Sequence, residues 1–200
     1  MLELFHKGGP VMWPLLVTSL VSVTVIIERL FFIYLERRKR NPALVQAIFS
    51  KVQTGNISEA IAHAEGHGDY VARVLVQGLK HKHKSFSDVL LTGATQEIKR
   101  FNERLYVLDT VITLAPLLGL FATVTGMIQS FNLLGGKELS APTVITGGIA
   151  EALIGTGFGL AIAIIALIPF NYLNQVVEKV RHEIEMAATH LELLLKGNAS

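Results

Sequence analysis

The sequence predicts an all-α, polytopic membrane protein with three transmembrane helices, two of them long and extending into a cytoplasmic helical bundle. Half of the 200 residues are hydrophobic and only 17% are charged, a composition typical of membrane proteins. Three apolar segments, 11–35, 107–134 and 144–173, each reach the roughly 20 residues that a helix needs to cross the hydrocarbon core. Lysine and arginine gather in the connections on one side, which gives the three segments an orientation.

The first apolar segment, 11–35, is the one that could be mistaken for a signal peptide. It is too long for that, has no small-x-small cleavage site, and continues past Glu28 and Arg29 to Leu35. The basic run 37–40 then closes it. We therefore expect a helix that is retained in the membrane.

The distribution of lysine and arginine predicts the topology. Most of them lie in 36–105 and several more in the tail, whereas the N-terminal piece and the loop 135–142 contain one lysine each. By the positive-inside rule, the N-terminus is expected to be periplasmic and the C-terminus cytoplasmic. The predicted order is a short periplasmic N-terminus 1–10, a transmembrane helix 11–35, a cytoplasmic helical segment 36–106, a transmembrane helix 107–134, a periplasmic loop 135–143, a transmembrane helix 144–173 and a cytoplasmic helical tail 174–200.

The cytoplasmic segment is expected to be helical rather than a separate catalytic domain. Asn41 is a helix cap followed by Pro42 at the first helical position, and apolar residues then recur with a helical period as far as Val52. The sequence shows no break over 86–134, which predicts a single helix about 73 Å long. The last helix, 142–195, is expected to be comparably long.

Small residues recur at helical spacing in the second and third spans. In the second span they form one face, Ala115, Gly119, Ala122, Gly126 and Ser130. In the third span they form another, Gly148, Ala152, Gly155, Gly159, Ala163 and Ala166. Such residues let two helix backbones approach closely, so we expect the two faces to mate. Pro116 removes one backbone donor and predicts a bend in the second span.

Thr123, Thr156 and Glu151 lie beside these faces and are the candidate polar groups of the spans. One interpretation is that each threonine only packs, with its hydroxyl bonded back to a carbonyl of its own helix. The other is that the hydroxyls line a polar path through the membrane. A carboxylate within a span is costly and favours function, so Glu151 is expected either to carry protons or to bond structurally to neighbouring helices.

The residue types give little support for a metal site, a nucleotide-binding site, an enzyme or a nucleic acid-binding protein. The chain has no cysteine, so neither disulfides nor thiolate metal sites can form. The fragment 155–159 lacks the spacing, the preceding strand and the lysine of a nucleotide-binding loop. The spans contain no histidine and no nucleophile paired with a base, so we expect no enzyme, no metal and no cofactor. A net charge of +2 gives no reason to expect a nucleic acid partner.

Four sequence blocks occur in a specific order along almost the whole chain. They are GGPVMWP at 8–14 with ERL at 28–30, APLLGLFATVTGMI at 115–128, GIAEALIGT at 148–156, and GLA at 159–161 followed by Asn171. In these blocks the chain resembles the MotA/TolQ/ExbB proton-channel family and, within it, the three-span ExbB/TolQ branch, with ExbB the better fit.

The resemblance implies a homo-pentameric ring around a dimer of a separate ExbD/TolR-like single-span protein, which carries the proton-accepting Asp. It implies that Thr123 and Thr156 face a central cavity near that Asp. It also implies that Glu151 matches the family's carboxylate in the third span. Hydroxyls in such a place donate to the ionised Asp and guide water, so they are expected to modulate its protonation.

The function implied is that of a proton-conducting stator subunit, surrounded by membrane lipids in the bacterial inner membrane. It would energise TonB-dependent outer-membrane transport through a TonB-like protein. A TolQ-like subunit for envelope constriction, a motility motor subunit and a non-conducting membrane scaffold are the alternatives. Two departures from the family pattern, Ala122 for the usual Gly and Ile165 for the usual Pro, affect the expected ring geometry and not the class.

Overall fold

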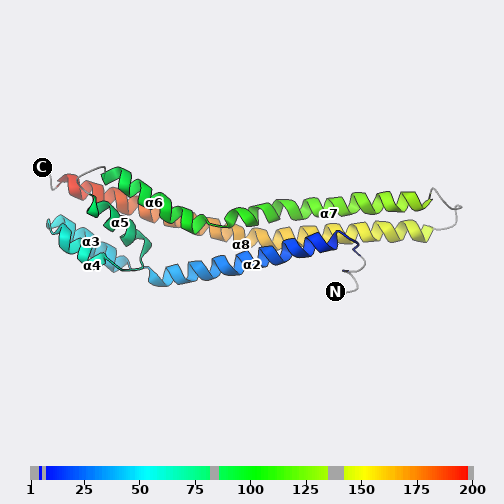
Figure 1. The fold of residues 1–200 in the computed structure, drawn as a ribbon, viewed down its shortest axis with the longest axis horizontal. Coiled ribbons are helices and arrows are strands. Elements are labelled where there is room, and N and C mark those ends of the chain that lie inside the picture. The colour runs from blue at the N-terminus through cyan, green and yellow to red at the C-terminus, as the bar shows by residue number, and fades with distance from the viewer. Residues whose placement is uncertain (1–4, 6–7, 82–85, 135–141, 198–200) are drawn as a thin grey trace. The chain divides into compact units, whose positions relative to one another are not determined.

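The computed structural model describes residue 5 and residues 8–81, 86–134 and 142–197. Its helices are α2 (Met12–Lys39), α3 (Pro42–Gln53), α4 (Ile57–Ala64), α5 (Tyr70–Lys80), α6 (Phe86–Asn102), α7 (Leu105–Leu134) and α8 (Pro142–Gly197) (Figure 1). The described residues contain no strand, and the all-α prediction is confirmed. Residues 135–141 of the predicted periplasmic loop, and residues 1–4 and 6–7 of the predicted N-terminus, lie outside the described residues.

Three of these helices are long and apolar enough to cross a membrane, namely α2, the stretch Leu105–Asn132 of α7 and the stretch Gly147–Gly197 of α8. The predicted number of spans is therefore confirmed by length and composition. Many of their large apolar side chains are exposed within the single chain, for example Leu117 at 61% and Leu153 at 63%. So much exposed apolar surface requires a covering of lipid or of another subunit.

The chain divides into two compact units. The first consists of residues 1–28 and 104–172, and the second of residues 29–103 and 173–200. Helices α2 and α8 each contribute residues to both units.

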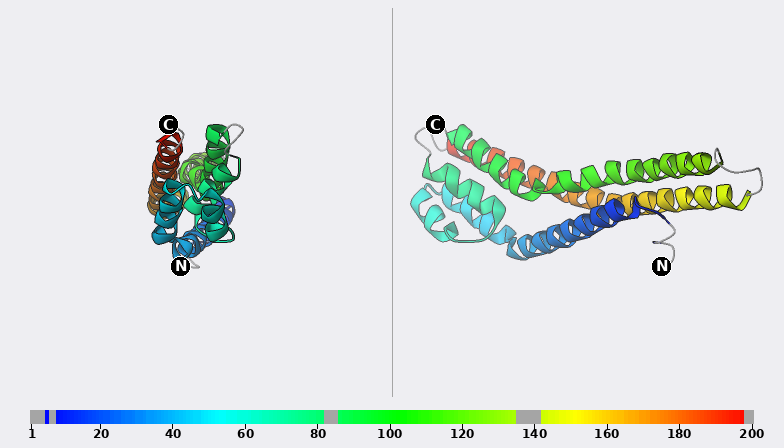
Figure 2. Two further views of the ribbon diagram at one scale, coloured as in Figure 1. Left: turned by 90° about the vertical axis from the view of Figure 1, so that its left-hand side faces the viewer. Right: turned by 45° about the vertical axis from the view of Figure 1, so that its right-hand side comes forward.

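In the first unit, α7 and α8 lie side by side, as Figures 1 and 2 both show. Its buried core combines larger residues at the start of α2 with alanines of the other two helices: Val11, Met12, Leu15, Ala115, Ala122 and Ala163. The methyl groups of the alanines fill little space, so the helices can pack at short range.

The second unit contains the short helices α3 to α6 together with the C-terminal part of α8. The predicted cap of α3 is present, since the side-chain oxygen of Asn41 accepts a hydrogen bond from the Leu44 amide at 3.2 Å. Asp69 caps α5 in the same way, with Oδ1 accepting from the amides of Val71 and Ala72 at 2.8 and 3.0 Å. Both caps satisfy amides that a helix start leaves without partners.

The prediction of one unbroken helix over 86–134 is wrong. α6 ends at Asn102 and α7 begins at Leu105, and Arg104 between them adopts a left-handed backbone with φ of 63°. A residue in this conformation ends a helix because it turns the chain out of the helical path. Glycine usually occupies such a position, and an arginine there gives no sequence signal. The Arg104 guanidinium lies 3.2 Å from a Glu28 carboxylate oxygen.

Replacing Arg104 by valine is expected to lower the free energy of unfolding by about 1–2 kcal/mol, because a β-branched side chain fits poorly at positive φ. Replacing it by glycine is expected to change stability by less than about 1 kcal/mol, because relief of backbone strain offsets loss of an exposed ion pair. Denaturant unfolding of both variants in detergent measures the difference. Equal stability of the two variants would contradict the strained turn.

Candidate functional site

The small-residue faces of α7 and α8 meet each other directly. A β-carbon added to Gly119 would lie 2.9 Å from the Thr156 α-carbon, and one added to Gly126 would lie 2.9 Å from the Ala152 β-carbon. At Gly155 an added β-carbon would lie 2.5 Å from that of Ala122. No real β-carbon tolerates such distances, so the two backbones are as close as glycine allows.

Two further glycines extend the same contact. An added β-carbon would collide with the Ala115 carbonyl oxygen at Gly159 and with the Ser130 hydroxyl at Gly148. By contrast, Gly157 on α8 has open space where its β-carbon would be. We call the five close-packed residues the glycine seam: Gly119, Gly126, Gly148, Gly155 and Gly159. Ala115 and Ala152 on the predicted faces are buried, at 0% and 2% exposure.

Pro116 lies inside α7, which continues without interruption from Leu105 to Leu134. It is half-buried and follows Ala115, whose carbonyl oxygen contacts Gly159 of the glycine seam. α8 likewise continues through Pro169.

The Thr156 hydroxyl lies between the two seam helices. Its oxygen is 2.8 Å from the carbonyl oxygen of Gly119 on α7 and 3.4 Å from that of Ala152 on its own helix, so it donates across the seam. A hydroxyl that donates one hydrogen bond still has lone pairs that can accept another. The Thr156 side chain is half-buried in the single chain, which leaves part of it accessible to a further helix or to water.

The Thr123 hydroxyl makes the local bond that a simple packing role predicts. It donates to the Leu120 carbonyl of its own helix at 2.6 Å, and its side chain is half-buried. Thr123 is one helical turn from Gly119, the residue that accepts from Thr156. The structure therefore brings both predicted threonines to the same stretch of α7 and α8.

Glu151 lies on a different side of α8, against the segment that precedes α2. Gly9, at φ of +72°, lies so close that an added β-carbon would collide with a Glu151 carboxylate oxygen. This carboxylate lines a pocket of about 180 Å³ with Gly8, Pro10, Val11, Phe121, Ala122, Thr125, Gly126 and Gln129. Neither Thr123 nor Thr156 is among the described residues that line it.

Sequence reasoning missed two polar neighbours of this pocket, Thr125 and Gln129. They stand four residues apart on α7, so they share one helix face, and that spacing was the available signal. Thr125 donates to the Phe121 and Ala122 carbonyls at 2.9 and 3.1 Å. The pocket is thus lined by one carboxylate, one amide and one hydroxyl among apolar groups.

A buried carboxylate in the second unit was also missed. The Glu36 side chain is only 2% exposed, and its oxygens lie 2.7 Å from Arg100, 3.1 Å from Lys39 and 3.4 Å from Arg73. Glu97 pairs with Arg73 at 2.8 Å and with Arg100 at 3.3 Å, so it links these two cations. This cluster joins α2, α5 and α6 by charge-assisted hydrogen bonds. Over the residues that the structure describes, no group of three potential metal-ligating side chains forms.

The comparisons with known proteins all match proteins of one family. A sequence model of the "MotA/TolQ/ExbB proton channel family" matches residues 67–186. The chain is 34% identical to biopolymer transport protein ExbB-like 1 of Synechocystis, over 98% of this chain and 79% of that protein. It is 26% identical to biopolymer transport protein exbB1 of Vibrio cholerae, over 98% and 88%. It is 36% identical to the Tol-Pal system protein TolQ of Haemophilus influenzae, over 44% and 39%. The matched range 67–186 contains the whole glycine seam.

Proposed function

Because the chain belongs to the MotA/TolQ/ExbB proton channel family, we propose that it is the proton-conducting stator subunit of an ExbB–ExbD-type motor. The motor converts the proton motive force into work on the cell envelope and energises TonB-dependent outer-membrane transport. The relatives from Synechocystis and Vibrio cholerae are both named biopolymer transport proteins, which supports this branch.

The Thr156 hydroxyl is the observation that carries the proposal. It lies where two membrane helices are held together by glycine, and Thr123 is one turn from its acceptor. Hydroxyls fixed in this way can accept from a protonated carboxyl group and can turn to donate to the ionised form. A hydrogen bond to the ionised form lowers the pKa of a carboxyl group. The two threonines would thereby time the uptake and release of protons by an acidic group on a partner helix.

The partner arrangement proposed is the one that the resemblance to the family implies. We propose a homo-pentamer around a dimer of an ExbD/TolR-like single-span protein that supplies the proton-accepting Asp, coupled to a TonB-like protein. The complex lies in the bacterial inner membrane with the N-terminus of this chain periplasmic and its C-terminus cytoplasmic. The described parts of the spans contain Glu151 but no cluster of carboxylates, which favours protons over sodium.

Two alternatives have an observation of their own. The match to the TolQ of Haemophilus influenzae favours a TolQ-like subunit for envelope constriction, with the same proton chemistry. The glycine seam by itself is equally suited to a membrane scaffold that assembles a complex without conducting. Proton flux separates the scaffold from the other two.

The test is proton uptake by liposomes that contain this chain and its single-span partner. Replacing Thr156 or Thr123 by valine keeps the shape and removes the hydroxyl, so proton uptake is expected to fall about tenfold or more, the value of one hydrogen bond to a charged group. Thr156→Ser keeps the hydroxyl and is expected to retain most of the flux. Thr24→Val is the matched control for Thr123→Val, because the Thr24 hydroxyl, like that of Thr123, donates only to its own helix, at 2.8 Å.

Two outcomes would overturn the proposal. Full proton uptake by both valine variants would remove the threonines from the pathway. No uptake by an assembled wild-type complex would favour the scaffold. Glu151→Gln, measured beside them, is expected to lower uptake if the carboxylate carries protons and to leave it unchanged if it only accepts hydrogen bonds.

A further inference from the structure

Asp109 is a carboxylate at the predicted cytoplasmic end of the second span, apart from the site described above. It lies in the second turn of α7, and its side chain is exposed in the single chain. Among the residues that the structure describes, none donates a hydrogen bond to this carboxylate or pairs with it. Arg104, the nearest cation along the chain, is already paired with Glu28 at 3.2 Å. A carboxylate in a membrane span is costly and usually functional, so its place here calls for a partner or for water.

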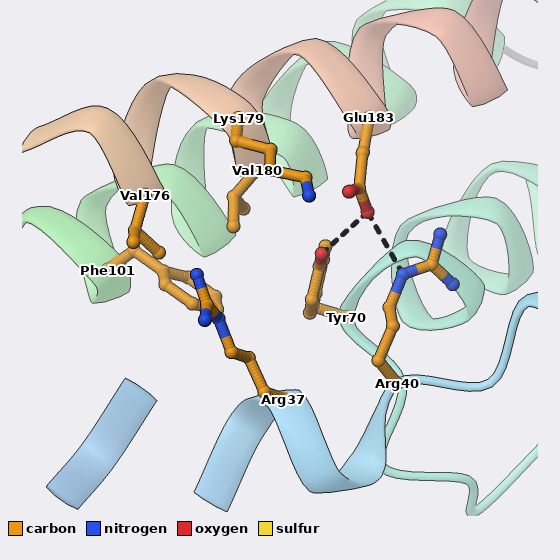
Figure 3. Close-up of a pocket in the computed structure, with 8 residues that line it drawn as sticks. All are labelled: Arg37, Arg40, Tyr70, Phe101, Val176, Lys179, Val180 and Glu183. Atoms are coloured by element: carbon orange, nitrogen blue, oxygen red, sulfur yellow. Dashed lines mark hydrogen bonds and ion pairs between the residues drawn. The ribbon is translucent and has the colours of Figure 1, made fainter. Parts of the chain in front are cut away.

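Two other carboxylates show what a structural role requires in this chain. Glu183 accepts hydrogen bonds from the Tyr70 hydroxyl at 2.7 Å and from the Arg40 guanidinium at 3.0 Å, as the dashed lines of Figure 3 mark. Glu36 is enclosed by three cationic side chains. Both groups are fixed by donors of their own subunit, whereas the Asp109 carboxylate has no described donor, so packing within one subunit does not explain it.

Asp109 lies on the same face of α7 as Thr123. The two residues are fourteen positions apart, close to four helical turns, so their directions differ by about 40°. Gly119 and Gly126 of the glycine seam point about 90° away from Asp109 round the same helix. The Asp109 side chain therefore does not enter the contact between α7 and α8, which agrees with its exposure. It continues the Thr123 face toward the predicted cytoplasmic side.

Pro116 adds a further polar group to this face, between Asp109 and Thr123. Proline has no amide hydrogen, so the Ile112 carbonyl, four residues earlier, lacks the donor that the helix would otherwise give it. A carbonyl freed in this way in a membrane helix takes its hydrogen bond from a neighbouring side chain or from water. A hydroxyl, a carbonyl and a carboxylate thus follow one another along one face of α7 over about 21 Å, most of the roughly 30 Å of the hydrocarbon core.

We propose that Asp109 is the proton-release group at the cytoplasmic end of the pathway. Water carries the proton from the partner's acidic group past Thr123 and the Ile112 carbonyl. The Asp109 carboxylate binds that proton and then gives it to water of the cytoplasm, so the carboxylate is regenerated and nothing is oxidised or reduced. Since no described residue neutralises the carboxylate, its charge is available to attract the proton. The inference rests on the proposed proton conduction and adds a residue to it.

The test is proton uptake by liposomes that contain this chain and its single-span partner. Asp109→Asn keeps the shape and removes the proton-binding group. Uptake is expected to fall about tenfold or more, because a positioned acid–base group typically contributes about 10²–10⁴-fold and water replaces it only in part. Asp109→Glu keeps the carboxylate and is expected to retain most of the uptake. Glu103→Gln is the matched control with wild-type uptake, because the Glu103 carboxylate is also exposed and without a described partner but lies outside α7.

A second readout tests whether position 109 faces water in the assembled complex. The chain has no cysteine, so a single introduced cysteine is its only thiol. Asp109→Cys is expected to react with a membrane-impermeant maleimide added to the cytoplasmic side of inverted membrane vesicles. Thr110→Cys lies at nearly the same depth but about 100° round the helix, and is expected to react about tenfold more slowly, because a thiol in apolar surroundings forms less of the reactive thiolate. Equal rates at the two positions would contradict a path along one face of α7.

The outcomes separate the role of Asp109 from the proposed function. Full uptake by Asp109→Asn, beside loss of uptake by Thr156→Val, would overturn the role of Asp109 and leave the threonine pathway intact. Equal loss by Asp109→Asn and Asp109→Glu would also overturn it, because the position would then act through shape rather than through a carboxylate. No uptake by the assembled wild-type complex would overturn the proposed function, and the role of Asp109 with it. Uptake is compared per assembled complex, measured by size-exclusion chromatography, so that poor assembly of a variant is not mistaken for loss of conduction.

Discussion

Replacing Glu36 by alanine is expected to lower the free energy of unfolding of the second unit by about 3 kcal/mol. The carboxylate is 2% exposed and is surrounded by Arg100, Lys39 and Arg73. Removing one partner of a buried ionic group typically costs about 3–5 kcal/mol, because the charges left behind have lost their compensation. The lower end applies here, since the Arg100 and Arg73 side chains are 36% and 31% exposed and regain water.

Denaturant unfolding in detergent, followed by far-ultraviolet circular dichroism, measures this loss. The matched control is Glu59→Ala, which removes the carboxylate of an exposed pair with Lys51. The Glu59 side chain is 60% exposed, so the control is expected to cost less than about 1 kcal/mol. If the two variants lost the same amount, the buried cluster would be no more important than a surface ion pair.

The cluster around Glu36 shows what the sequence could not predict. Arg73 and Arg100 come from helices far along the chain, and only the tertiary packing of α2, α5 and α6 brings them to one carboxylate. The same holds for the contact of Gly9 with Glu151, which joins residues more than a hundred positions apart. Local spacing carries no information on such long-range pairs.

Features set by local periodicity were predictable. The three apolar spans and the cap at Asn41 follow from residue types within a few turns of one another. The break at Arg104 was missed because a non-glycine residue occupies the left-handed position. For the candidate site, the small residues identified the contacting faces of α7 and α8, but the direction of the Thr156 hydroxyl depends on where the Gly119 carbonyl lies. Side-chain partners of this kind need the tertiary structure.

Replacing Gly159 by alanine is expected to destabilise the first unit by about 3 kcal/mol, the upper end of the range for overpacking. The added methyl would collide with the Ala115 carbonyl oxygen and lie 3.1 Å from the Gly119 α-carbon. Backbone atoms cannot rotate away as a side chain can, so α7 and α8 must separate. Separation would also break the hydrogen bond from Thr156 to Gly119, so the proposed proton uptake is expected to fall together with stability.

Gly157→Ala is the control, because it makes the same substitution two residues away on the same helix with open space at the β-carbon. Alanine favours a helix over glycine by about 1 kcal/mol, so this variant is expected to be as stable as the wild type or more stable. Thermal unfolding in detergent compares the two. Equal stability of Gly159→Ala and Gly157→Ala would contradict the close contact of the helices.

A pair of double mutants identifies which atoms make the contact. An alanine at position 155 would meet the Ala122 β-carbon at 2.5 Å, so Ala122→Gly is expected to rescue Gly155→Ala. Gly159→Ala meets the carbonyl of Ala115, which every residue carries, so Ala115→Gly is expected to give no rescue. Rescue in the first pair and none in the second would show that Gly155 faces a side-chain methyl group and that Gly159 faces backbone atoms of α7. The opposite result would mean that side chains, and not backbones, hold α7 and α8 apart.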